Sequence, residues 1–269
     1  MFENITIGQY YPGKSVIHRL DPRTKINSVL ALVVAIFMAR HSITILGLSG
    51  LLVGIVIIAR IPFKYLMKGL RPILLIGTLT FLLNVFVTSG TVIFLIGPLR
   101  VTEEGLRQGG YLVWRLIMLV MTTSMLTLTT PPVTLTDGLE SVLKPYRRLG
   151  VPAHELAMMM TIALRFIPTL IEETGKIMKA QMARGADFES GNIVRRAKNL
   201  IPLLVPLFVS AFRRADELAI AMESRCYRGG ENRTRLKQLK YTRLDAAGYA
   251  MMAAVLMAVV WLRYRGTVW

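Results

Sequence analysis

Two arginines, Arg184 and Arg225, each follow a helical run of apolar side chains, and their type and position suit recognition of a partner. A guanidinium is always charged, and it can bind a carboxylate through two parallel hydrogen bonds or enter a groove of another protein. Two cations near helix ends also complement the helix macrodipole, an effect of roughly 0.3–1 kcal/mol each. Because the same spacing precedes both arginines, we favour a duplicated docking device.

Small residues surround both arginines, so each guanidinium is able to protrude from its helix. The two predicted docking sites consist of Ala183, Arg184, Gly185, Ser224, Arg225 and Cys226. The second site therefore differs from the first on both sides of its arginine.

The histidines and the cysteine do not form a reaction centre. His18, His41 and His154 are scattered, without a carboxylate or cysteine at metal-ligand spacing, and the single cysteine, Cys226, excludes an internal disulfide. No Gly-x-x-x-x-Gly-Lys-Ser/Thr motif occurs, so ATP hydrolysis would need another chain. We expect no catalytic residue, metal or cofactor. The alternative is a membrane-embedded enzyme acting on a lipid or isoprenoid substrate, which would need a constellation of carboxylates, histidines or metal ligands.

The helices that carry the two arginines are predicted to be amphipathic. The apolar or small positions of the first, at steps of four and three, are Leu156, Met160, Ala163, Ile167, Leu170, Thr174 and Ile177. Those of the second are Leu204, Phe208, Ala211, Ala215, Leu218 and Met222, and Gly229-Gly230 is the expected stop. Crossing a bilayer would bury charges such as Glu173 and Arg214 at a cost of several kcal/mol per group, so both helices are expected along the cytoplasmic face.

The rest of the chain is typical of a membrane protein. Its apolar content is 53% and its formal net charge is +17, so the charge must collect outside the hydrocarbon. Five apolar runs approach the length of about 20 residues that a bilayer-spanning helix needs. They are Ile26–Ala39, Ser42–Ala59, Ile73–Thr88, Gly110–Thr130 and Ala246–Leu262. The fold class expected is an all-α integral membrane protein with about five transmembrane helices.

Three regions follow from this pattern. Residues 1–130 form an amino-terminal membrane domain with about four spans, 131–243 form a cytoplasmic domain with the two arginine-tipped helices, and 244–269 form a last transmembrane helix. Clusters of Lys and Arg between the spans predict a cytoplasmic amino terminus. The basic run Arg228–Arg243 suits the lipid bilayer or an acidic protein partner rather than nucleic acid.

Several short motifs resemble the T component of energy-coupling factor (ECF) vitamin transporters along nearly the whole chain. They are Gly8-Gln9-Tyr10, His18-Arg19-Leu20-Asp21-Pro22-Arg23-Thr24-Lys25, Thr129-Thr130-Pro131, Leu149-Gly150-Val151-Pro152, Ala163-Leu164-Arg165-Phe166-Ile167-Pro168 and Ala183-Arg184-Gly185. Singly these motifs are weak, and together they are specific.

The resemblance implies a coupling subunit of the cell membrane, not an enzyme. In that family two Ala-Arg-Gly-like motifs dock into two related ABC-type ATPase subunits, which implies those roles for Arg184 and Arg225. A separate membrane-embedded S component binds the vitamin, and ATP-driven closure of the ATPases shifts the coupling helices so that the S component topples. Because methionine repacks easily, an S-component contact is expected at Met158, Met159, Met160, Met178 and Met182, and a lipid-facing or internally packed stripe explains them equally well.

Overall fold

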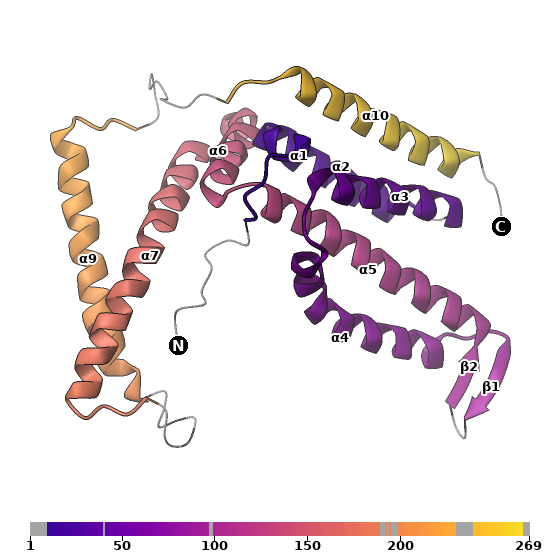
Figure 1. Ribbon diagram of the computed structural model, residues 1–269, viewed down its shortest axis with the longest axis horizontal. Coiled ribbons are helices and arrows are strands. Elements are labelled where there is room, and N and C mark those ends of the chain that lie inside the picture. Colours follow the sequence, from indigo (N-terminus) through magenta and orange to yellow (C-terminus); the bar gives the residue numbers. More distant parts are fainter. Residues whose placement is uncertain are drawn as a thin grey trace. The chain divides into compact units, whose positions relative to one another are not determined.

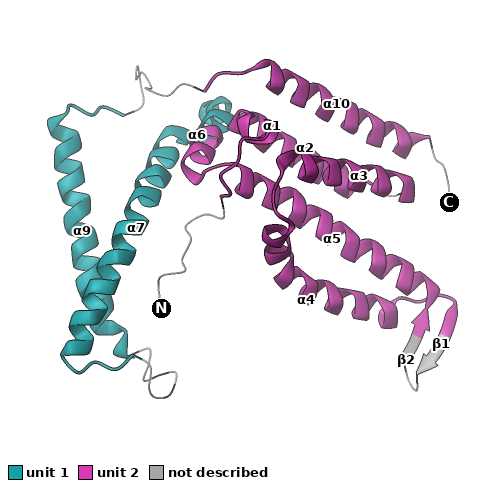
Figure 2. Ribbon diagram, in the orientation of Figure 1, with its two compact units in different colours: residues 1–7, 140–237 teal, residues 8–139, 238–269 magenta. Residues whose placement is uncertain are grey.

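The computed structural model describes most of the chain. The described residues are 10–39, 41–96, 99–188, 192, 194, 198–229 and 239–265. Gly8 and Gln9 of the first motif, and 230–238 of the basic run, lie outside them. The described chain divides into two compact units (Figure 2), of which unit 1 is residues 1–7 and 140–237 and unit 2 is residues 8–139 and 238–269.

Unit 2 contains most of the helices and a small hairpin (Figure 1). Its elements are α1 (Val16–Arg19), α2 (Pro22–Met38), α3 (Ser42–Ala59), α4 (Phe63–Val87), β1 (Val92–Ile96), β2 (Leu99–Thr102), α5 (Glu103–Thr129) and α10 (Arg243–Tyr264). Helix α6 (Pro132–Leu143) contains the boundary between the units. Unit 1 continues with the short 3-10 helix η1 (Lys144–Leu149), then α7 (Ala153–Ala183) and α9 (Ile201–Ser224).

The chain is an all-α membrane protein, as the sequence predicts. Among the described residues, five helices are long and apolar enough to cross a membrane, namely α3, α4, α5, α7 and α10. Helix α2, with 17 residues, corresponds to the first predicted span. Helix α7 satisfies the criterion of length and composition although its charges led us to expect a position along the membrane face. Composition alone therefore does not decide how α7 meets the bilayer.

Helices α4 and α5 begin before the predicted apolar runs. Helix α4 begins at Phe63, ten residues before the predicted start, and runs through Pro72. Helix α5 begins at Glu103 because the Thr102 hydroxyl accepts a hydrogen bond from the Gly105 amide at 3.2 Å. A short apolar piece after α4 forms β1 and pairs antiparallel with β2. Hydropathy alone missed the start of α5, since its cap is polar.

Helices α2, α3, α5 and α10 enclose the largest buried cluster of unit 2. It includes Ile36 from α2, Leu48 from α3, Met118 from α5 and Met252 from α10. Removing these side chains from lipid or water into a packed interior fixes the four helices against one another. This cluster lies in the later half of α2 and from the middle of α10 onward, away from the end of the bundle at which both helices begin.

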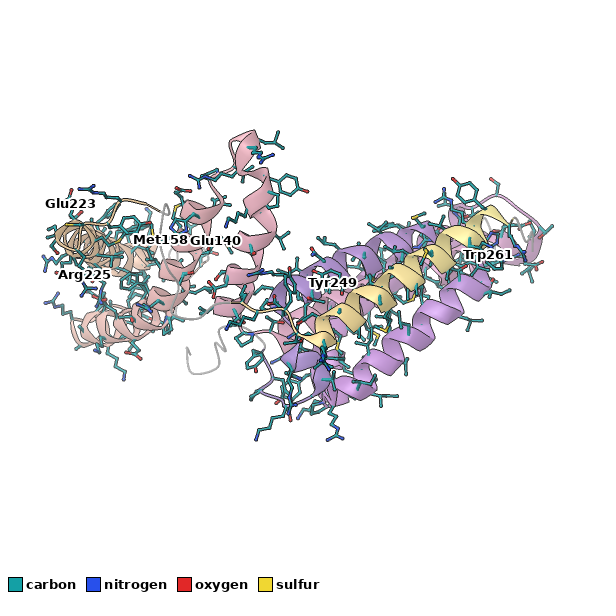
Figure 3. The ribbon with its side chains drawn as sticks, turned by 90° about the horizontal axis from the view of Figure 1, so that it is seen from above. Glu140, Met158, Glu223, Arg225, Tyr249 and Trp261 are labelled. Carbon is teal, nitrogen blue, oxygen red and sulfur yellow. The ribbon has the colours of Figure 1, made fainter. Side chains whose placement is uncertain are left out.

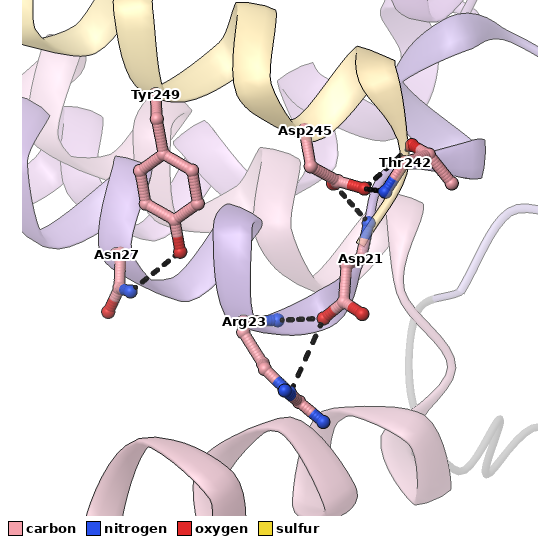
Figure 4. Close-up of polar contacts among 6 residues, drawn as sticks. All are labelled: Asp21, Arg23, Asn27, Thr242, Asp245 and Tyr249. Atoms are coloured by element: carbon pink, nitrogen blue, oxygen red, sulfur yellow. Dashed lines mark hydrogen bonds and ion pairs between the residues drawn. The ribbon is translucent and has the colours of Figure 1, made fainter. Parts of the chain in front are cut away.

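A buried carboxylate joins the starts of α2 and α10 (Figure 4). The Asp245 carboxylate, 1% exposed, accepts a hydrogen bond from the Asp21 amide at 2.8 Å. It also accepts from the Thr242 amide and hydroxyl at 2.8 and 2.7 Å, which forms a capping box at the start of α10. The Asp21 carboxylate in turn caps α2 by accepting from the Arg23 amide at 2.9 Å. Asp21-Pro22-Arg23 is thus a structural turn entering α2.

Candidate functional site

Arg184 lies in a tight turn that closes the carboxyl end of α7. Gly185 has a φ of +88° and donates its amide to the Met182 carbonyl at 2.9 Å, while the Ala186 amide donates to the Gln181 carbonyl at 2.9 Å. These two bonds form a Schellman motif, whose left-handed position favours glycine. Arg184 itself is the last residue before that position and is exposed. The backbone turn therefore explains why glycine follows Ala183 and Arg184 in the sequence.

Arg225 lies in the same motif at the end of α9, although its neighbours differ. The Cys226 amide donates to the Glu223 carbonyl at 2.8 Å, and the Tyr227 amide donates to the Met222 carbonyl at 3.0 Å. Cys226 takes the left-handed position with a φ of +54°, where a side chain is strained. Helix α9 consequently ends at Ser224, and the expected stop at Gly229-Gly230 is wrong because the helix ends five residues before Gly229.

The two arginine turns stand at opposite ends of an antiparallel helix pair. Near the start of α9, the Gln181 amide nitrogen lies 3.4 Å from the Pro202 carbonyl. Near its end, Met158 and Ile162 of α7 line one cavity of about 410 Å³ together with Leu218 and Met222 of α9. Arg225 is therefore level with Met158, and at 1.5 Å per residue the helix separates it from Arg184 by about 40 Å.

An ion pair joins the middle of the two helices. The Arg214 guanidinium donates to the Glu173 carboxylate at 2.9 Å, and the Ser210 hydroxyl donates to the same carboxylate. The pair is half exposed, so its contribution to stability is small, at most about 1 kcal/mol. It fixes the register of the helices rather than holding them together.

A side chain that sequence reasoning missed, Tyr227, ties the Arg225 turn to the start of α7. Its hydroxyl lies 2.9 Å from the Met158 sulfur and 3.3 Å from Nε2 of His154. Nδ1 of His154 lies 3.0 Å from the Glu140 carboxylate. Because a carboxylate only accepts, Nδ1 of His154 donates to Glu140, while the single hydroxyl proton of Tyr227 is directed at the Met158 sulfur. Figure 3 shows Met158 and Glu140 near the end of α9 that carries Arg225 and Glu223.

The remaining residues of the predicted sites have the following positions. Ala183 and Ser224 are the last residues of their helices, and the Ser224 hydroxyl donates to the Ala221 carbonyl at 3.1 Å. Met159, Met160 and Met182 are exposed. Met158 and Met178 are partly buried, and Met158 accepts the Tyr227 hydrogen bond. The five methionines therefore do not form one continuous free surface.

Elsewhere in the described chain, His18 is a titratable group with structural partners. Among the described residues, no group of three or more His, Cys, Asp or Glu side chains is close enough to hold a metal ion. The His18 ring contacts the Ser15 hydroxyl at 2.6 Å and the Tyr11 carbonyl at 3.1 Å. Burial lowers the pKa of His18, while the bond to Tyr11 opposes this shift and Lys25 adds to it.

Comparison with known proteins agrees with the resemblance in the sequence. The family model described as cobalt transport protein, CbiQ, matches residues 13–236. A relative from Thermosediminibacter oceani, an energy-coupling factor transporter transmembrane protein, is 64% identical over 255 residues, which cover 95% of this chain and 96% of the relative. A protein of the same description from Bacillus subtilis is 49% identical over 264 residues, covering 98% of this chain and 100% of the relative.

Proposed function

This chain belongs to the family of transmembrane T components of ECF transporters, and from that premise we propose that it couples two ABC-type ATPase subunits to a substrate-binding S component. The observation that carries the proposal is the repeated arginine turn. Two helices with unlike sequences end in the same Schellman motif, and each presents an exposed arginine just before the left-handed residue. A motif repeated in this way suits two related partners, each receiving one arginine.

The arrangement of the two turns supports a position of α7 and α9 along the cytoplasmic face. Arg184 and Arg225 lie at opposite ends of the pair, about 40 Å apart. If the pair crossed a bilayer core of about 30 Å, the two arginines would lie on opposite sides of the membrane. ATPase subunits that use cytoplasmic ATP need both arginines on one side. The half-exposed Glu173 to Arg214 ion pair also suits the interface rather than the hydrocarbon.

The exposed apolar side chains of unit 1 suit the S component. On α7 they include Met159, Met160 and Met182, and on α9 Phe208 and Phe212 are 60% and 69% exposed. Apolar surface of this size is typical of an interface with lipid or protein, and methionine adapts to partners of different shape. In the proposed mechanism, closure of the ATPases moves the two arginine turns, and the antiparallel pair transmits this movement to the S component and its vitamin.

The experiment that tests this function combines association with transport. Arg184→Ala, Arg225→Ala and the double variant are compared with wild type for co-purification of the ATPase subunits and for ATP-dependent vitamin uptake. Arg213→Ala is the matched control, because it removes an exposed guanidinium from the middle of α9. Each single variant is expected to lose much of the association, and the double variant to lose nearly all of it and all uptake.

The same experiment can overturn the proposal. A wild-type chain that co-purifies with no ATPase contradicts the coupling function. Arginine variants that match the Arg213→Ala control in both association and uptake contradict the assigned docking sites. Membrane insertion, measured by fractionation, has to remain at the wild-type level in every variant for the comparison to hold.

A further inference from the structure

Unit 2 contains an apolar cavity of about 370 Å³ between α1, α2, α3, α5 and α10. The four polar side chains that line it are Lys25, Ser28, Thr122 and Thr129. The Thr122 and Thr129 hydroxyls donate to carbonyls of their own helix at 2.8 and 2.7 Å. The Lys25 ammonium has three donors and contacts three oxygens, those of the His18 and Thr129 carbonyls and the Thr130 hydroxyl, at 3.0–3.3 Å. A polar cargo would find few partners here.

The cavity follows the helices inward from one end of the bundle. Along α2 its lining runs from Lys25 to Leu32, and along α10 from Leu244 to Met252. At 1.5 Å per residue these stretches are about 10–12 Å long, close to the depth of one leaflet of the hydrocarbon core. A spanning helix of another protein would need about 30 Å, so a lining of this length suits a shorter apolar ligand.

The end from which the cavity starts is basic. Among described residues 10–25 and 239–245, the cations are Lys14, Arg19, Arg23, Lys25, Lys240 and Arg243, against the carboxylates Asp21 and Asp245. Both carboxylates already accept hydrogen bonds in the turn between α2 and α10. Arg19 and Arg243 are exposed, and each precedes a residue that lines the cavity, Leu20 and Leu244 respectively. A negative headgroup at this end would therefore meet two exposed guanidinium groups.

We propose that this cavity binds one acyl chain of an anionic phospholipid, with the headgroup at Arg19 and Arg243. The apolar lining accommodates the chain, and basic pockets at the cytoplasmic ends of membrane helices recognise anionic lipid headgroups. The bound lipid fills space that the side chains leave open between α3 and α10. It is a structural ligand of unit 2, independent of the arginine turns of unit 1.

Glycines on α3 provide a matched pair of variants. Gly54 lines the cavity, and a Cβ added there meets no atom within 4 Å, so Gly54→Phe fills the space without a backbone clash. Gly47 lies on the same helix with equally open surroundings, is exposed, and does not line the cavity. Gly47→Phe therefore adds the same side chain outside the site.

The test is native mass spectrometry of the full chain in detergent with added phosphatidylglycerol or phosphatidylcholine of identical acyl chains. We expect wild type and Gly47→Phe to retain phosphatidylglycerol about tenfold better than phosphatidylcholine. Gly54→Phe is expected to lose this retention. The Arg19→Gln/Arg243→Gln double variant is expected to lose the headgroup preference while still binding either lipid weakly.

Two results would overturn the proposal. Equal retention of phosphatidylglycerol by Gly54→Phe and Gly47→Phe would show that the lipid binds elsewhere. Equal binding of the two lipids by wild type would contradict the proposed preference for an anionic headgroup. To show that it is folded, each variant must elute from a sizing column as a single symmetric peak. If Gly54→Phe fails this requirement, Gly54→Leu takes its place with Gly47→Leu as control.

Discussion

The two arginine turns have one backbone geometry and two different supports. At Arg184 the left-handed residue is Gly185, which adopts a φ of +88° without strain. At Arg225 it is Cys226, for which a left-handed conformation costs about 1–2 kcal/mol. At the second turn the residue after the left-handed one also reaches the other helix, because Tyr227 contacts Met158 and His154. Side-chain contacts at one end thus offset a backbone cost that the other end avoids.

The largest effect should come from the arginines themselves. Arg184→Lys and Arg225→Lys keep the charge but lose the planar fork of donors, so each is expected to weaken ATPase association by about 2 kcal/mol, roughly thirtyfold. Titration of the purified chain with the ATPase subunits measures the loss. Comparable losses at the two sites would confirm that the turns are equivalent. A loss at Arg184 alone would show that the second turn is not a docking site.

The second largest effect is expected from exchanging the left-handed residues Gly185 and Cys226. Gly185→Cys is expected to destabilise its turn by about 1 kcal/mol, because cysteine is strained at a left-handed φ. Cys226→Gly should stabilise the other turn by about 0.5–1 kcal/mol, because glycine adopts that φ without strain. Amide hydrogen exchange at Ala186 and Tyr227 reports the opening of each turn. Shifts of the same sign in both variants would contradict the assignment of strain to Cys226.

The tyrosine anchor should have an effect of about 1 kcal/mol. Tyr227→Phe removes the hydroxyl that contacts Met158 and His154 and keeps the ring, so hydrogen exchange at the Arg225 turn should become faster while that at Arg184 stays unchanged. Tyr146→Phe is the control, since Tyr146 is 52% exposed. Unchanged exchange in Tyr227→Phe would mean that the turn does not depend on this contact.

The smallest effect should come from the ion pair midway between the turns. Glu173→Gln removes the charge that Arg214 contacts at 2.9 Å, and because both side chains are partly exposed the loss should be about 0.5 kcal/mol or less. Exchange rates in the middle of α7 and α9 should rise slightly, with both arginine turns unaffected. A loss as large as that of Tyr227→Phe would show that the pair holds the helices together.

Sequence patterns predicted much of this architecture because they report local physics. Apolar runs located the helices of unit 2, and the step of three and four residues led to both arginines. The starts of α5 and α10 were placed too late, although Thr102 and the pair Thr242 and Asp245 carry recognisable capping signals. These two starts were placed too late because hydropathy was used to predict a helix boundary that polar capping residues determine.

The face of α7 that meets α9 could not be predicted from periodicity. The apolar stripe included Leu156 and Met160, yet both are exposed, and the contacts with α9 come from Met158, Glu173 and Gln181. A helix with broad apolar surface offers several faces, and only the partner selects one. The predicted apolar stripe of α7 is thus exposed at Leu156 and Met160 and partly buried at Ile167, Leu170 and Ile177. The docking role of the arginines at the helix ends stays a prediction.

By itself, the sequence determined the helical membrane fold, the family and the two arginines, since helix periodicity, hydropathy and short motifs are properties of neighbouring residues. Only the tertiary structure decided that Cys226 closes its turn as Gly185 does, that Tyr227 reaches His154 across 73 positions of sequence, and that α2, α3 and α10 leave an apolar cavity. The Tyr227 contact and the cavity depend on groups distant in sequence, which come together only when the helices pack.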